Sequence, residues 1–363
     1  MHGRKRESKE VKYAEARVAA RRKKAKLYAA LSRECFARRR ARRYDPESLA
    51  LCAKLLELNC ELYSLWNYRK EYLEPRLDGV DGVDGGDGGE GGGESREDLV
   101  RAELKLIEVA LQKNPKSYCT WQHRRWLVSH PAGLVDLDRE LALCDLLLSA
   151  DARNFHCWSY RRFIAARNGK GPTAELDFTT TKVHQNFSNY SAWHNRSAIL
   201  PRIAATDGDD VGWAHRLVSE FDLVRQAFYT EPEDQSAWLY HRWLVSKQQE
   251  LLRGDGNAEG ADAAAASTSR DDGLGGAAWD NVLAQEVQMC RDLLAIEPDS
   301  KWPMLTLARL LCVRGGRSAN EGDGEAGAGA DADANEARDI LHRLASLDPM
   351  RKGYYADAIT AME

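Results

Sequence analysis

Five tryptophans recur in this chain within one local sequence frame. The frame reads ELYSLWNYRK, PKSYCTWQHRR, RNFHCWSYRR, FSNYSAWHNRS and EDQSAWLYHRW, with Trp66, Trp121, Trp158, Trp193 and Trp238. Successive tryptophans lie 55, 37, 35 and 45 residues apart, and the first interval falls to 37 when the tract at 78–95 is removed. A period of about 35 to 37 residues is typical of stacked helical hairpins, which bury one another's apolar faces. The sequence therefore predicts an all-α stack of hairpins.

Two positions flank each tryptophan at fixed spacing. Seven residues before it stands a polar or acidic residue, which is a signal for a turn and a helix N-terminus: Asn59, Asn114, Asp151, Asn186 and Glu231. Seven residues after it stands an aliphatic or small residue, two turns along the same helix face: Leu73, Val128, Ala165, Leu200 and Val245. We expect each tryptophan and its plus-seven neighbour to pack inward together.

An arginine follows the tryptophan by three residues in four of the five copies, namely Arg69, Arg124, Arg161 and Arg196. The fifth copy has His241 there, followed by Arg242. Because this position lies close to the tryptophan face of a helix, the guanidinium groups should be partly buried and paired with carboxylates or carbonyls. The alternative, a basic row that faces a ligand or partner, stays open.

Composition narrows the class of protein. The chain has 363 residues with 43% hydrophobic content, enough for a large core, and no run of 18 apolar residues that would span a membrane. No apolar segment of a signal peptide precedes the repeats, so a cytoplasmic protein is expected. The eight cysteines form no C-x-x-C pair, which favours free thiols over disulfides or a zinc site.

The N-terminal segment carries most of the positive charge. Residues 1–43 hold 17 Lys or Arg against four Glu, although the whole chain has a net charge of −4. This segment has alanine, leucine and tyrosine at helical spacing, which favours a basic leader helix that docks on an acidic surface over a nucleic-acid arm. No motif for sequence-specific readout accompanies it, so no nucleic-acid partner is expected.

Three Gly-, Ala- and acid-rich tracts interrupt the remaining chain and read as disordered insertions. They divide it into a basic leader at 1–43, a helical-repeat region at 44–314 with insertions at 78–95 and 253–278, a further insertion at 315–335, and a C-terminal capping helix and tail at 336–363. A degenerate sixth hairpin, around Trp302, is expected after the fifth repeat.

The repeat frame resembles that of protein prenyltransferase alpha subunits over residues 49–250. Further stretches resemble the alpha subunits of Rab geranylgeranyltransferases in particular: MHGR at the start, NPKSY at 114–118, DARNFHCWSYRRF at 151–163, NFSNYSAWH at 186–194, DSKWPMLTL at 299–307 and LDPMRKGYYADAI at 347–359. Alpha subunits of farnesyltransferase share the frame but not the LDPMR tail. The resemblance implies a right-handed superhelical solenoid of alpha repeats, similar to tetratricopeptide repeats.

The resemblance also implies a division of labour. A beta subunit would hold zinc and most of the prenyl pocket, with geranylgeranyl diphosphate bound at the subunit interface. The heterodimer would transfer geranylgeranyl groups to C-terminal cysteines of Rab GTPases that the Rab escort protein presents. Two alternatives stay open: an alpha subunit shared by farnesyltransferase and type I geranylgeranyltransferase, and a non-catalytic helical-repeat scaffold.

Site residues follow from the resemblance, position by position. Lys116 and Tyr118 match the family's Lys and Tyr near the diphosphate, although sequence alone describes Lys116 as an exposed turn lysine. Phe155 and His156 match a Tyr–His pair that faces the same cleft, and Phe155 lacks the hydroxyl. His156 is a candidate hydrogen-bond donor to diphosphate, or a histidine satisfied within an interface. His2, in the MHGR stretch, is a candidate regulatory ligand of the beta-subunit zinc.

Overall fold

The computed structural model describes residues 15–79, 95–130, 133–207, 210–254, 276–320 and 324–362. These residues form helices joined by short turns, and none of them lies in a β-strand. The all-α prediction is confirmed. Two compact units make up the chain, Met1–Gly169 and Lys170–Glu363.

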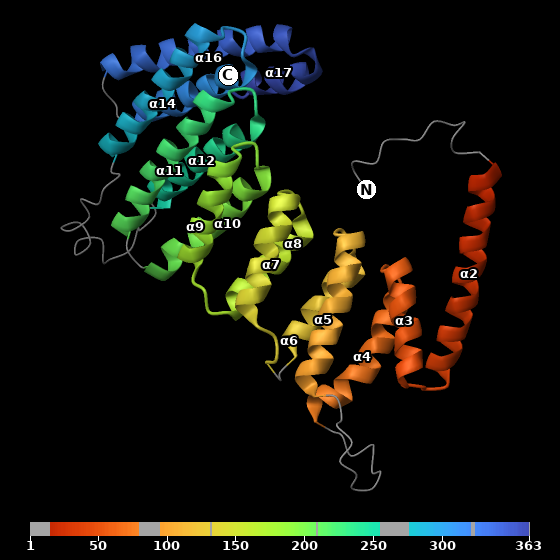
Figure 1. Ribbon diagram of the computed structural model, residues 1–363. Coiled ribbons are helices and arrows are strands. Elements are labelled where there is room, and N and C mark those ends of the chain that lie inside the picture. The colour runs from red at the N-terminus through yellow and green to blue at the C-terminus, as the bar shows by residue number, and fades with distance from the viewer. Residues whose placement is uncertain are drawn as a thin grey trace. The chain divides into compact units, whose positions relative to one another are not determined.

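The first unit contains a leader helix followed by three helical hairpins (Figure 1). Its helices are α2 (Glu15–Arg40), α3 (Pro46–Leu58), α4 (Tyr63–Asp78), α5 (Arg96–Lys113), α6 (Tyr118–Ser129), α7 (Leu137–Ala150) and α8 (Phe155–Arg167). First helices pack on first helices, as α3 does on α5, and second helices pack on second helices, as α4 does on α6 and α6 on α8. The hairpins therefore stack in two layers, and the second helices share one layer.

The second unit continues the same construction (Figure 1). Its elements are α9 (Pro172–Gln185), α10 (Tyr190–Asp207), α11 (Asp210–Thr230), α12 (Gln235–Gly254), α14 (Gly276–Ile296), α15 (Lys301–Asn320), α16 (Gly324–Leu347), the 3-10 turn η1 (Pro349–Arg351) and α17 (Lys352–Thr360). Helices α14 and α15 pack together as the expected sixth hairpin, and α16 packs on α15 and α17. The 3-10 turn η1 separates α16 from α17.

Each repeat tryptophan is buried and holds the turn that precedes it. The five side chains are at most 5% exposed, and their plus-seven neighbours are buried as well. Each indole N–H donates to the backbone carbonyl six residues earlier, at 2.7–2.9 Å, in Cys60, Pro115, Ala152, Phe187 and Pro232. The predicted inward packing is confirmed, and the hydrogen bond explains why the frame needs tryptophan rather than another large apolar residue.

Replacing Trp193 by Phe should therefore destabilise the chain by about 1–2 kcal/mol, because the Phe187 carbonyl loses its donor and a gap opens in the core. Urea unfolding of the purified chain measures the change. Tyr190→Phe, on a half-exposed ring three residues earlier, is the control and should stay within about 0.5 kcal/mol of wild type. Equal effects of the two substitutions would contradict a structural role for the indole N–H.

The arginines at plus three are buried in ion pairs, as predicted. Arg69, Arg124 and Arg196 each form a forked pair with a glutamate of the next hairpin, Glu103, Glu140 and Glu220 respectively. Arg161 pairs with Asp145. His241, the fifth member, lies 2.9 Å from Glu286 on α14. Among the described residues, this row therefore joins helices to one another rather than facing outward.

The partner glutamates were not recognised from the sequence, although they carry a signal. Glu103, Glu140 and Glu220 each stand 18 residues before a repeat tryptophan. Each also accepts a hydrogen bond from the residue two after that tryptophan, as Glu140 does from the Tyr160 hydroxyl at 2.6 Å and Glu220 from the Tyr240 hydroxyl at 2.6 Å. One carboxylate thus joins three helices from two hairpins.

Charge and hydrogen bonding keep the Glu103 carboxylate ionised. Burial raises the pKa of Glu103, but the Arg69 charge and the hydrogen bonds from His123 and Arg69 outweigh it and lower the pKa to about 2. Burial lowers the pKa of His123, against the opposing effect of Glu103. The pair is therefore an ionised carboxylate beside a neutral imidazole at neutral pH.

The prediction of disorder over 315–335 is wrong for the residues that the structure describes there. Residues 315–320 belong to α15, and residues 324–335 belong to α16. A side chain at Gly315 would meet the Ala330 carbonyl at 3.3 Å, so glycine lets the two helices approach. Arg314 also pairs with Asp333 at 2.6 Å. The alanines between the acids favour a helix, which the composition argument had overlooked.

The other two tracts lie mostly outside the described residues, which omit 80–94 and 255–275. Their ends are helical or cap a helix: Ser95 accepts a hydrogen bond from the Asp98 backbone N–H at the start of α5.

The basic leader forms α2, which packs on α3. Arg39 of α2 pairs with Glu71 of α4 at 2.5 Å. The eight cysteines are free thiols, and six of them are buried.

Candidate functional site

The turns between paired helices are built alike. In four repeats the residue seven before the tryptophan ends the first helix: Asn59, Asn114, Asp151 and Asn186. Each side-chain oxygen accepts a hydrogen bond from the amide two residues later, at 2.9–3.3 Å. These residues therefore mark the turn, as predicted, but the N-caps of the following helices in two repeats are Ser117 and Asn154.

Lys116 projects from the turn before α6. Its Nζ lies 3.0 Å from the Asp151 Oδ2 of the next turn, and its side chain is 38% exposed, so solvent and ligands can reach it. The Asn154 side-chain Nδ2 also links the two turns, because it donates to the Pro115 backbone carbonyl at 3.0 Å. An anion that binds Lys116 would therefore replace Asp151 as its partner, while the hydrogen bond between the turns holds the backbone around Lys116 in place.

Tyr118, Phe155 and His156 come together at the start of α6 and α8. The rings of Tyr118 and His156 meet edge to face with centroids 4.3 Å apart, and Tyr118 lies 5.9 Å from Phe155. The Tyr118 and Phe155 side chains are 61% and 56% exposed. The structure thus brings together the four residues that the sequence had named in this region, within the first unit.

His156 differs from its neighbours because it is buried. Its Nε2 has no hydrogen-bond partner among the described residues. Burial lowers the pKa of His156, while the Glu61 charge and a hydrogen bond with the Lys116 backbone act in the opposite direction. Because the ring N–H of the neutral imidazole is used in the bond to the Lys116 backbone, its Nε2 is left to accept one hydrogen bond, and it becomes a donor only when the ring is protonated.

Carboxylates flank this cluster. The Glu61 carboxylate, from the turn before α4, accepts a hydrogen bond from the Asn114 side-chain Nδ2 at 3.3 Å. Its backbone carbonyl accepts from the Cys119 thiol at 3.4 Å, and burial, together with the Glu61 charge, raises the pKa of Cys119 to about 11. Cys119 is therefore a poor nucleophile. The ion pair between Lys116 and Asp151 had one signal in the sequence: the two residues stand in turns of neighbouring repeats.

Tyr63 is a further exposed aromatic residue that was not recognised from the sequence. Tyr63 occupies the same position in the first repeat, three residues before the tryptophan, and is 63% exposed. Exposed aromatic rings thus begin α4, α6 and α8, all in the layer of second helices. Such rings offer large contact areas to a partner or an apolar ligand.

Two predictions concern metal and membrane. His2 lies outside the described residues, so its proposed zinc contact stays a prediction. In the described part of the chain, no group of three or more His, Cys, Asp or Glu side chains could hold a metal ion. A search of the same residues found no helix with the length and apolar character needed to cross a membrane.

Comparisons with known proteins agree on one family. Five matches to the protein prenyltransferase alpha subunit repeat cover residues 45–74, 100–131, 137–168, 172–203 and 217–248. The geranylgeranyl transferase type-2 subunit alpha of Rattus norvegicus is 42% identical over 254 residues, 69% of this chain and 42% of that protein. Its counterpart in Bos taurus is 42% identical over 70% of this chain and 43% of that protein. The chain thus spans less than half the length of these mammalian relatives.

A relative from Dictyostelium discoideum, also a geranylgeranyl transferase type-2 subunit alpha, is 34% identical over 86% of this chain and 84% of its own length. The fold is similar to that in the structure of Candida albicans protein geranylgeranyltransferase-I complexed with GGPP, with a TM-score of 0.61 at 18% identity over 93% of this chain and 91% of that one. Because five repeats match and one relative is covered nearly throughout, the chain belongs to the protein prenyltransferase alpha subunit family.

Proposed function

We propose that this chain is the alpha subunit of a heterodimeric, cytoplasmic Rab geranylgeranyltransferase. The similarity to type-2 alpha subunits carries the proposal, since it includes a relative that the chain covers over 84% of its length. In this proposal a beta subunit binds the chain and holds zinc, and the Rab escort protein presents the Rab substrate. His2 would approach that zinc in the enzyme without substrate.

The reaction would join a cysteine sulfur to the allylic C1 of geranylgeranyl diphosphate. The C–S bond forms as the C1–O bond breaks, and diphosphate leaves with the electron pair. Zinc on the partner would keep the sulfur deprotonated. This chain would stabilise the leaving group. Lys116 would exchange Asp151 for a diphosphate oxygen and stabilise the negative charge that develops there. Lys116 also precedes α6, whose N-terminus favours anions.

Tyr118 and His156 would complete the contacts. The Tyr118 hydroxyl is on an exposed ring beside Lys116 and can donate one hydrogen bond to an oxygen of the diphosphate. The His156 Nε2, which lacks a partner among the described residues, can donate another when the anion favours the protonated imidazole. Phe155 has no hydroxyl, so it would contribute only apolar contact.

Co-expression with candidate beta subunits, followed by labelled geranylgeranyl transfer to a Rab protein, tests the proposal. We expect a stable complex with a type II beta subunit and transfer that requires the escort protein. The chain alone should be inactive. Preferential assembly with a farnesyl-type or type I beta subunit, or transfer by the chain without any beta subunit, would contradict the proposal.

A further inference from the structure

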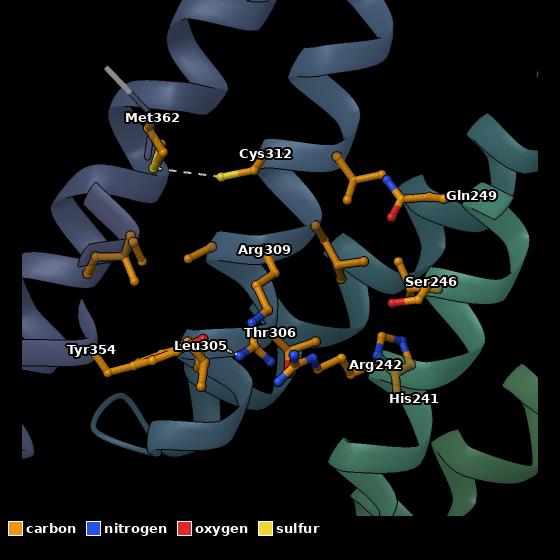
Figure 2. Close-up of a pocket in the computed structure, with 16 residues that line it drawn as sticks. His241, Arg242, Ser246, Gln249, Leu305, Thr306, Arg309, Cys312, Tyr354 and Met362 are labelled. Carbon is orange, nitrogen blue, oxygen red and sulfur yellow. Dashed lines mark hydrogen bonds between the residues drawn. The ribbon is translucent and has the colours of Figure 1, made fainter. Parts of the chain in front are cut away.

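A cavity of about 250 Å³ lies within the second unit, between α12, α15 and α17 (Figure 2). Its walls are largely apolar and include Val245, Leu305, Leu341 and Met362. Cys312 also lines it and is exposed, so the cavity opens to solvent at that point. Ligand pockets in proteins combine such apolar walls with a few polar groups that fix orientation.

Two guanidinium groups supply the charge of this cavity. Arg242 of α12 and Arg309 of α15 both line it, and Figure 2 shows their side chains extending into the space between these helices. Arg309 donates a hydrogen bond to the Tyr354 hydroxyl. No acidic residue lines the cavity, and neither arginine forms an ion pair within the described part of the chain. Among the described residues, these two positive charges therefore have no carboxylate partner.

The nearby buried carboxylate does not neutralise them. Glu286 is fully buried and is already shared by two partners, Arg225 at 2.7 Å and His241 at 2.9 Å. His241 forms part of the cavity wall, but this interaction engages its Nε2. The arginines are thus the groups left to bind an anion, in contrast to the repeat arginines, each of which has a carboxylate of its own.

We propose that this cavity binds a compact amphipathic acid, with the carboxylate on Arg242 and Arg309 and the apolar body against Val245, Leu305 and Met362. Arginine suits this task because its planar fork binds carboxylates with two parallel hydrogen bonds. The cavity has a volume of about 250 Å³ and opens to solvent beside Cys312, so part of a ligand can extend out of it. This volume fits a short chain or one apolar residue.

Two sources carry this chemistry: a free medium-chain carboxylic acid, or the C-terminal residue of a peptide, whose side chain and carboxylate share one Cα. Isothermal titration of the full chain with octanoate and with N-acetylleucine separates them, and the uncharged amides of both are the matched probes. We expect the preferred acid to bind at least about tenfold more tightly than its amide, because only the acid pairs with guanidinium.

Arg309→Gln and Arg242→Gln should each reduce acid binding by about tenfold and leave amide binding unchanged. Arg343→Gln is the matched control, since Arg343 pairs with Asp299 and does not line the cavity. A change in fold would affect acid and amide alike, so the ratio between them reports the charge contact. Tighter octanoate binding assigns a free acid, and tighter N-acetylleucine binding assigns a peptide terminus.

Equal binding of acid and amide would overturn the proposal. So would an acid affinity that neither arginine substitution changes, because the charge contact would then not exist. Absence of binding up to about 10 mM, beyond the weak end of specific affinities, would have the same consequence. Each result is independent of prenyl transfer, so the cavity can be tested whether or not the proposed enzyme function holds.

Discussion

Lys116→Ala is expected to slow geranylgeranyl transfer by about 30- to 1,000-fold, the equivalent of about 2–4 kcal/mol for one lost contact to a developing anion. The heterodimer should still form. Among the described residues Lys116 pairs with Asp151 alone, and both side chains are more than one-third exposed. Such pairs contribute about 0–1 kcal/mol to stability, so the fold should tolerate the substitution. Single-turnover transfer with a co-expressed beta subunit measures the effect.

Lys113 provides the matched control for that experiment. Lys113 stands three residues before Lys116, is exposed, and pairs with Glu57 at 2.9 Å. Lys113→Ala therefore removes one positive charge at a position outside the cluster. Its rate should stay within about twofold of wild type. Asp151→Asn removes the carboxylate that would compete with diphosphate for Lys116, so this variant should not slow transfer. A Lys116→Ala rate equal to that of Lys113→Ala would remove Lys116 from the mechanism.

The stack of hairpins was predictable because every repeat carries the same local signals for its own helices. A tryptophan with an aliphatic residue seven positions later defines one buried helix face without knowledge of any other repeat. The partners of the arginines were not predictable in the same way. Glu140 belongs to the hairpin after Arg124, so the pair depends on which helices stack, and only the 18-residue spacing to Trp158 links it to the frame.

At the C-terminal tract, composition is a poor guide to structure. Gly, Ala and acidic residues suggested disorder over 315–335, but tertiary contacts stabilise helices in the described part of this tract. Gly315 permits close approach to Ala330, and Arg314 pairs with Asp333. In the candidate site, the family resemblance supplied Lys116, Tyr118 and His156. The burial of His156 and the contact of Lys116 with Asp151 required three-dimensional packing between consecutive turns.

Glu140→Ala should destabilise the chain by about 3–5 kcal/mol, because it leaves the Arg124 guanidinium buried without its carboxylate. Arg124 is 1% exposed and forms two hydrogen bonds to Glu140, both 2.6 Å long. The Tyr160 hydroxyl would lose its acceptor as well. Glu108 lies 3.8 Å from Arg124 and can compensate in part. Urea unfolding of the purified chain measures the loss.

Two variants separate the buried charge from simple loss of a side chain. Glu57→Ala breaks the exposed pair with Lys113 and should cost no more than about 1 kcal/mol. The double variant Arg124→Met with Glu140→Leu removes both charges and fills the space, so it should recover much of the stability lost in Glu140→Ala. If the double variant is instead as unstable as Glu140→Ala, the cost comes from packing rather than from an unpaired guanidinium. The recurring arginine would then serve the frame through its shape and not through its charge.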